Sequence, residues 1–162
     1  MLTLSVPPEL TKTITVALQK AGQREIGGVL MAEHIGHNEF RVKDLTVHRR
    51  GAFASFVRRI EEALGRLRLF FERAEHNYRR FNYIGEWHSH PSFAAEPSET
   101  DHASMRQIIE DPEVGANFVV LLVVKLNPQG RLVGSAHTYL PNGVCSRSVV
   151  QFADLPHIAS ST

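Results

Sequence analysis

Two stretches with helical periodicity stand out in the pattern of hydrophobic and polar positions. Residues 7–21 lie between Pro7, which can open a helix, and Gly22, which can close one. A longer run from about 56 to 79 carries apolar residues at three- and four-residue steps, which predicts an amphipathic helix packed on a core. Its apolar stripe comprises Ile60, Ala63, Leu64, Leu67, Phe70, Phe71, Ala74 and Tyr78.

A third helix is predicted over residues 99–110. Ser98 is its expected N-cap, and Pro112 follows its end. Asp101 falls in the first turn, beside the positive end of the helix dipole, where it can cap the helix or bind a metal. The buried side of this helix is predicted to be Ala103, Met105, Ile108 and Ile109.

Short apolar or alternating runs between these helices predict strands. The first two runs flank a turn that contains Gly36, which indicates a hairpin. A nearly continuous apolar run later in the chain is typical of a strand buried on both faces. Together the runs predict a mixed sheet that carries helices. The predicted strands cover 29–32, 40–47, a strand from 81 to the histidines that follow, 117–126, 131–140 and 144–152.

His88 and His90 stand at the end of an apolar strand, so alternation places both imidazoles on one face. Trp87, directly before His88, is expected to point the opposite way. Pro91 cannot continue a central strand, and the following loop can bring Asp101 back as a third metal donor, leaving a fourth position for water. An isolated histidine or a Ser-x-x-Asp helix start usually has a structural role. The joint spacing His-x-His-x7-Ser-x-x-Asp favours a metal centre instead.

The segment Gly85-Glu86-Trp87-His88-Ser89-His90-Pro91, with Ser98 and Asp101 after it, resembles the metal-binding signature of the JAMM (MPN+, JAB1/MPN/Mov34) metalloprotease family. This family contains zinc-dependent deubiquitinases and their prokaryotic relatives. The resemblance implies that His88, His90 and Asp101 bind one zinc ion, with a water as the fourth ligand. Zinc suits this donor set best, although iron or manganese can occupy a similar one.

The same resemblance assigns two further residues. The family places a glutamate just before a glycine-rich strand, and Glu25-Ile26-Gly27-Gly28 fits that pattern, so Glu25 is the expected general base. Ser98 is expected to stabilise the oxyanion of the tetrahedral intermediate. The resemblance covers nearly the whole chain. It implies a single α/β JAMM (MPN) domain over residues 1–155, with a mixed, mostly antiparallel sheet flanked by helices, and a polar C-terminal tail at 156–162 that frays.

Length, composition and charge restrict the class of protein and its expected cellular location. A chain of 162 residues with 43% hydrophobic content can bury one core, and a net charge of +1 argues against a large nucleic-acid footprint. No apolar run is long enough for a membrane span or a signal peptide. Cys145 is alone, so no internal disulfide can form; we expect it to be buried and the protein to be cytoplasmic. His34, His37, His76 and His102 are expected to have ordinary structural roles.

The motif combination looks more like prokaryotic members of the family than like proteasomal ones. It implies a ubiquitin-like protein and its conjugates as substrates, with E1- or E2-like partners, including pathways of antiphage defence. The modifier's C-terminal tail would add beside a strand at the cleft, and the segment Arg49–Phe56 is predicted to form a flap. Three alternatives stay open: a peptidase acting on sulfur-carrier precursors or ordinary peptides, a RadC-like DNA-associated protein, and a non-catalytic MPN scaffold.

Overall fold

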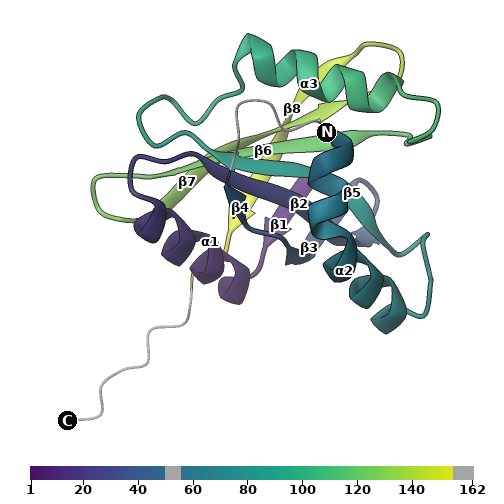
Figure 1. Cartoon of the computed structure of the whole chain (residues 1–162), viewed down its shortest axis with the longest axis horizontal. Helices are drawn as coiled ribbons and strands as arrows, with labels where there is room; N and C mark the ends of the chain where they lie inside the picture. Colours follow the sequence, from purple (N-terminus) through teal and green to yellow (C-terminus); the bar gives the residue numbers. More distant parts are fainter. Residues whose placement is uncertain (50–55, 155–162) are drawn as a thin grey trace.

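The computed structural model describes residues 1–49 and 56–154 (Figure 1). The predicted flap, apart from its two ends, and the predicted tail at 156–162 lie outside these residues. Within them, three helices surround an eight-stranded sheet. The helices are α1 (Pro8–Ala21), α2 (Phe56–Arg73) and α3 (Glu99–Glu110). The strands are β1 (Thr3–Val6), β2 (Ile26–Gly36), β3 (Glu39–Leu45), β4 (His48–Arg49), β5 (Phe81–Ser89), β6 (Val119–Leu126), β7 (Leu132–Tyr139) and β8 (Cys145–Phe152).

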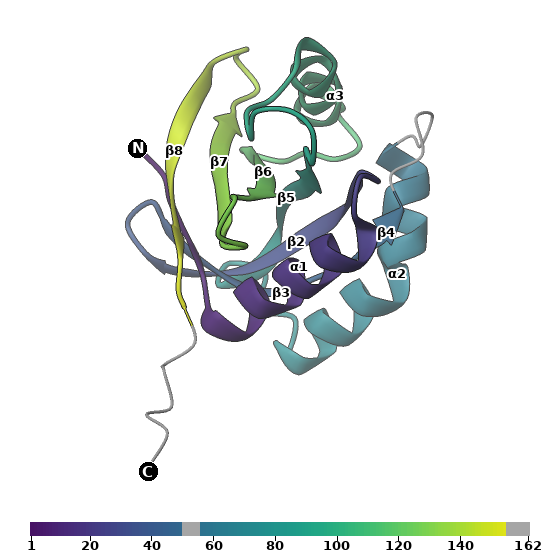
Figure 2. The ribbon, with the colours of Figure 1, turned by 90° about the vertical axis from the view of Figure 1, so that its left-hand side faces the viewer.

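The sheet has the strand order β3-β1-β8-β7-β6-β5-β2-β4. Because β3 also pairs with β2, the sheet curls back on itself (Figure 2). β4 pairs with the first two residues of β2, on the same edge as β3. The pairings β1–β3, β1–β8 and β5–β6 are parallel, whereas the other five are antiparallel. The predicted single α/β domain with a mixed, mostly antiparallel sheet is confirmed.

Three apolar clusters hold the helices on the sheet, and β6 contributes to two of them. Val120, Leu122 and Val124 face the α1 side, whereas Val119, Leu121 and Val123 face α3. This alternation explains why the strand reads as a continuous apolar run, since both of its faces are covered. The third cluster joins α2 to β2 through Val29, Met31, Ala63, Leu67 and Phe70.

The predicted helix at 56–79 is too long, because α2 ends at Arg73. Glu75 and His76 both take a left-handed conformation, with φ of 53° and 56°, and a helix cannot continue through two such residues. Two members of the predicted stripe are also wrong, since Leu64 and Tyr78 are exposed. The stripe that packs on the sheet is correspondingly narrower.

The helix at 99–110 is confirmed, with Ser98 as its N-cap. Met105, Ile108 and Ile109 are buried as predicted, but Ala103 is exposed. A helix turns about 100° per residue, so a face containing Met105 and Ile108 leaves Ala103 on the solvent side. The prediction that Cys145 is buried is also wrong, because this residue is partly exposed at the start of β8.

Candidate metal centre

His88 lies near the end of β5, which runs between β2 and β6, and His90 follows directly after the strand. His88 pairs with Gly27 on one side and Val123 on the other, and the His90 N–H donates to Val124 O over 2.9 Å. Trp87 points to the opposite face, where it is buried in the α1 cluster and donates its Nε1–H to a backbone carbonyl. The predicted alternation along this strand is therefore confirmed.

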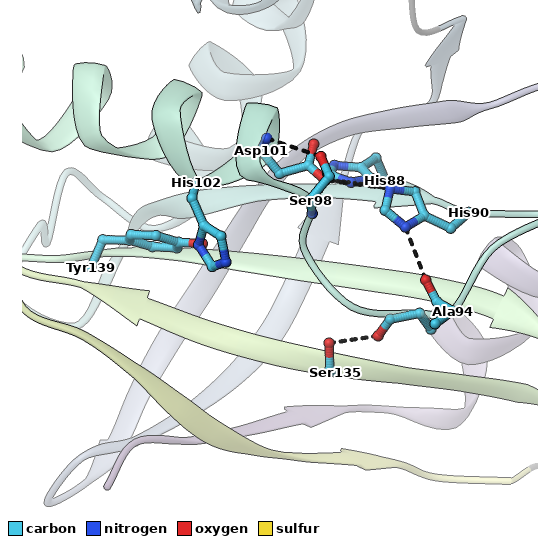
Figure 3. Close-up of polar contacts among 9 residues, drawn as sticks. His88, His90, Ala94, Ser98, Asp101, His102, Ser135 and Tyr139 are labelled. Carbon is cyan, nitrogen blue, oxygen red and sulfur yellow. Dashed lines mark hydrogen bonds and ion pairs between the residues drawn. The ribbon is translucent and has the colours of Figure 1, made fainter.

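His88, His90 and Asp101 form a compact buried group of three metal-donor side chains (Figure 3). The two Nε2 atoms are 3.1 Å apart, and Asp101 Oδ2 lies 3.3 Å from that of His88 and 3.4 Å from that of His90. Donors on a tetrahedral ion at roughly 2.0–2.1 Å would lie about 3.3–3.4 Å from one another. The spacing fits three ligands of one first-row metal ion, with the fourth tetrahedral position left open.

The His90 ring is held in the tautomer that a metal requires. Its Nδ1 lies 3.0 Å from the carbonyl oxygen of Ala94, which can only accept, so Nδ1 carries the hydrogen and Nε2 keeps its lone pair. The next carbonyl, of Ala95, accepts a 2.6 Å hydrogen bond from the Ser135 hydroxyl on β7 (Figure 3). Ser135 is 2% exposed, so a buried donor holds the loop that orients His90.

Asp101 is oriented by the start of its own helix. Ser98 donates both its backbone N–H and its hydroxyl to Asp101 Oδ2, each over 2.8 Å, and accepts from the Asp101 N–H over 3.2 Å. Oδ2, the carboxylate oxygen that Ser98 holds in this capping box, is also the oxygen that faces the two histidines. In this structure Ser98 therefore positions a metal donor. Its predicted contact with an oxyanion stays a prediction, and it requires the hydroxyl to turn.

Glu25 lies half-buried in the short connection between α1 and β2. Gly27 pairs with His88, and the Ile26 N–H donates to the Ser89 hydroxyl over 3.0 Å. Continuing the Gly27–His88 pairing by two residues sets the backbone of Glu25 beside His90. Glu25 thus stands at the end of β2 that is nearest the three donors, and its role as a general base stays a prediction.

A cleft opens beside His88 and Asp101, bounded by β2, α2 and α3. Gly27 and Gly28 form its β2 wall. A Cβ on Gly28 would come within 2.0 Å of a backbone oxygen of Thr46, so this wall can only be built from glycine. Arg59 from α2 and Glu86 from β5 line the cleft as an ion pair, with 2.8 Å between Nε and Oε1.

The neighbouring histidines contact other groups. His102 Nδ1 lies 2.8 Å from the hydroxyl of Tyr139, not beside the three donors, as expected for a structural role (Figure 3). Burial raises the pKa of Tyr139, which keeps its hydroxyl neutral. Burial also lowers the pKa of His137, against the opposing charge of Glu96. Neither His137 nor Ser135 carries a local motif by which the sequence could have singled it out.

Residues 7–138 match the family model described as prokaryotic homologs of the JAB domain. The chain belongs to this family. The predicted family resemblance is therefore confirmed, and the matched range includes every predicted site residue. A curated relative, "Probable metalloprotease y4qB" of Sinorhizobium fredii (strain NBRC 101917 / NGR234), is 41% identical over 51 residues. That match covers 31% of this chain and 31% of the relative, so about two thirds of the relative lies outside it.

One solved structure supports the fold of this JAB-domain protein. Protein DSY2949 from Desulfitobacterium hafniense superposes with a TM-score of 0.66 at 16% identity, covering 96% of this chain and 97% of the other. A JAB1/MPN domain protein from Archaeoglobus fulgidus is a looser likeness, with a TM-score of 0.44 at 16% identity over 92% and 98% of the two chains. None of the described helices combines the length and apolar character needed to cross a membrane.

Proposed function

We propose that this protein is a zinc-dependent metalloprotease that hydrolyses peptide or isopeptide bonds at the C-terminus of a ubiquitin-like modifier. The observation that carries the proposal is the set of three buried donors, 3.1–3.4 Å apart, at the edge of a cleft. Membership of the JAB family and the relative named as a metalloprotease support a hydrolytic role. Two imidazoles and one carboxylate suit zinc among first-row metals.

Each residue has a defined task in this proposal. His88, His90 and Asp101 would hold the ion, which when bound supplies Lewis acidity for the scissile carbonyl and for the attacking water. Glu25 accepts the proton that the water gives up and passes it to the leaving amine. Ser98 keeps Asp101 Oδ2 directed at the histidines. The buried surroundings of the donors strengthen these electrostatic interactions by limiting solvent.

The proposed substrate is the extended C-terminal tail of the modifier, with a small residue at the scissile bond. The glycine wall of the cleft supports a small residue, because Gly27 pairs with His88 and neither Gly27 nor Gly28 carries a side chain into the cleft. The proposed setting is the cytoplasm, where E1- or E2-like enzymes would make the conjugates that this protein cleaves, including in antiphage defence. A single cysteine is compatible with a reducing compartment.

A cleavage assay with matched variants tests the proposal. The substrates are ubiquitin-like proteins fused through their C-terminal tails to a reporter, with short unstructured peptides for comparison. We expect Glu25→Gln to retain zinc and to lose roughly a hundredfold to ten-thousandfold in rate. Glu110→Gln, the same change at an exposed position of α3, should cleave like the original protein. A zinc-loaded original protein that cleaves no modifier fusion would refute the proposed substrate.

A further inference from the structure

A groove runs between α1 and β4, which lie side by side in both views of the ribbon (Figures 1 and 2). It has a volume of about 680 Å³, within the roughly 300–1,000 Å³ of ordinary ligand sites. One wall is the outer side of α1 from Glu9 to Ala21, and the other is formed by residues 47–49. This groove is separate from the cleft at the metal donors, although the two adjoin.

The groove adjoins the metal cleft at β4. His48 and Arg49 line both hollows. Ile26 lines the groove, the adjacent Gly27 lines the cleft, and Gly27 pairs with His88 across the sheet. The groove and the cleft thus open on opposite faces of β2 and meet at β4, so a polypeptide segment that lies along the groove and passes β4 would enter the cleft at the metal donors.

The charges around the groove are predominantly positive. Its lining contains Lys12, Lys20, Arg24 and Arg49, all exposed, and a single acidic residue, Glu9. The whole chain has a net charge of only +1, so this concentration of basic residues is a local feature. A surface of one sign attracts ligands of the opposite sign and excludes those of the same sign.

The groove also offers apolar contacts and a strand edge. Val16 and Ala17 are half-buried on the α1 wall, and Val47 is 43% exposed on the opposite wall. Among the described residues β4 pairs only with β2 and is the last strand in the order, so an extended segment can pair with its other edge. An extended segment whose acidic and apolar side chains alternate fits this combination.

We propose that the groove between α1 and β4 binds an extended acidic segment of the substrate chain that leads to the scissile bond. This inference rests on the proposed protease function and adds the chemistry by which the substrate is selected. A substrate tail rich in lysine or arginine would be disfavoured, because its charges would face Lys12, Lys20 and Arg49.

Peptide binding tests the inference without requiring cleavage. The probe is the fluorescein-labelled peptide Glu-Val-Glu-Val-Glu-Val-Gly-Gly-amide, compared with versions in which Gln or Lys replaces Glu, measured by anisotropy on the full chain. We expect the Glu peptide to bind at least about tenfold more tightly than the Gln peptide, with an affinity that falls as salt rises. The Lys peptide should bind more weakly still.

Two double variants locate the binding site. Lys12→Glu with Lys20→Glu reverses two exposed charges on the groove wall, and should weaken the Glu peptide about tenfold or more. Arg68→Glu with Arg73→Glu makes the same change in net charge at exposed positions of α2, and should alter binding by less than about twofold. Circular dichroism verifies that each variant is folded.

Equal weakening by both double variants, or equal affinity for the Glu and Gln peptides, would overturn the inference. The peptide series on the unaltered protein remains decisive if a variant does not fold. Preference for the Lys peptide would point to a basic tail and would also overturn it. Binding of the Glu peptide to the groove without cleavage of any fusion would instead refute the proposed protease function while leaving the proposed binding of an acidic segment intact.

Discussion

Ser135→Ala removes the hydroxyl that donates to Ala95 O over 2.6 Å. The affected loop also holds the His90 ring, because the preceding carbonyl accepts the Nδ1 hydrogen over 3.0 Å. Ser135 touches none of the three metal donors in the contacts that the structure describes. Loss of the Ser135 hydroxyl should therefore affect metal binding only by shifting the loop that holds His90. We expect it to lower metal affinity although Ser135 does not touch the donors.

The size of the effect can be estimated from these contacts. Partners that orient a metal-bound histidine are typically worth tenfold to a hundredfold in metal affinity. Ser135 acts one peptide group away from the carbonyl that His90 contacts, so we expect the lower end, about tenfold. Loss of a hydrogen bond from a buried donor to a half-buried carbonyl should also reduce the free energy of unfolding by about 1 kcal/mol.

Competition with a chromophoric zinc chelator measures the affinity, and urea unfolding of the metal-free protein measures the stability. Ser148→Ala is the matched control, because its buried hydroxyl makes a 2.7 Å hydrogen bond to Thr138 on the neighbouring strand and does not contact the loop. Both variants should lose similar stability, and only Ser135→Ala should lose metal affinity. Equal metal affinities in the two variants would refute the proposed coupling.

Two further predictions concern the scaffold and its pH dependence. Gly85→Ala should destabilise the fold by more than about 3 kcal/mol, because its Cβ would lie 1.9 Å from Val120 O at a φ of 151°. Gly65→Ala in α2, where the new Cβ would meet open space, should instead stabilise the fold by about 0.5–1 kcal/mol. Thermal unfolding measures both, and a stable Gly85→Ala protein would contradict the packing. Burial holds the pKa of His137 below its usual 6.5, so the unfolded chain takes up this proton first and stability falls as pH drops below 6.5. His137→Gln should have a shallower decline between pH 7 and 5 in urea unfolding, and an identical slope would contradict the assignment.

Most of the metal centre could be predicted from the sequence because its signals are local. The helix start at Ser98 brings its own capping partner Asp101 three residues later, and strand alternation is enough to place His88 and His90 on one face. The distances between the donor atoms, which match the geometry of one tetrahedral ion, could be obtained only from the structure. The catalytic parts assigned to Glu25 and Ser98 still depend on the family resemblance.

The features that sequence analysis missed depend on distant contacts or on weak local signals. β1 is only four residues long and becomes a strand because β3 and β8 pair with it from far along the chain. α2 stops at Arg73 although neither Gly nor Pro follows, since Glu75 and His76 adopt a conformation that is rare for their types. Ser135 supports a carbonyl 40 residues away, and no pattern within its own strand indicates that role.

Metal stoichiometry tests the central claim most directly. The full chain and its Asp101→Ala variant would each be loaded with zinc, desalted and assayed by inductively coupled plasma mass spectrometry against protein concentration. The geometry of His88, His90 and Asp101 predicts one zinc ion per chain in the original protein and a large loss in the variant. Retention of no zinc by the original protein, or of the same amount by both, would contradict a metal centre at these residues.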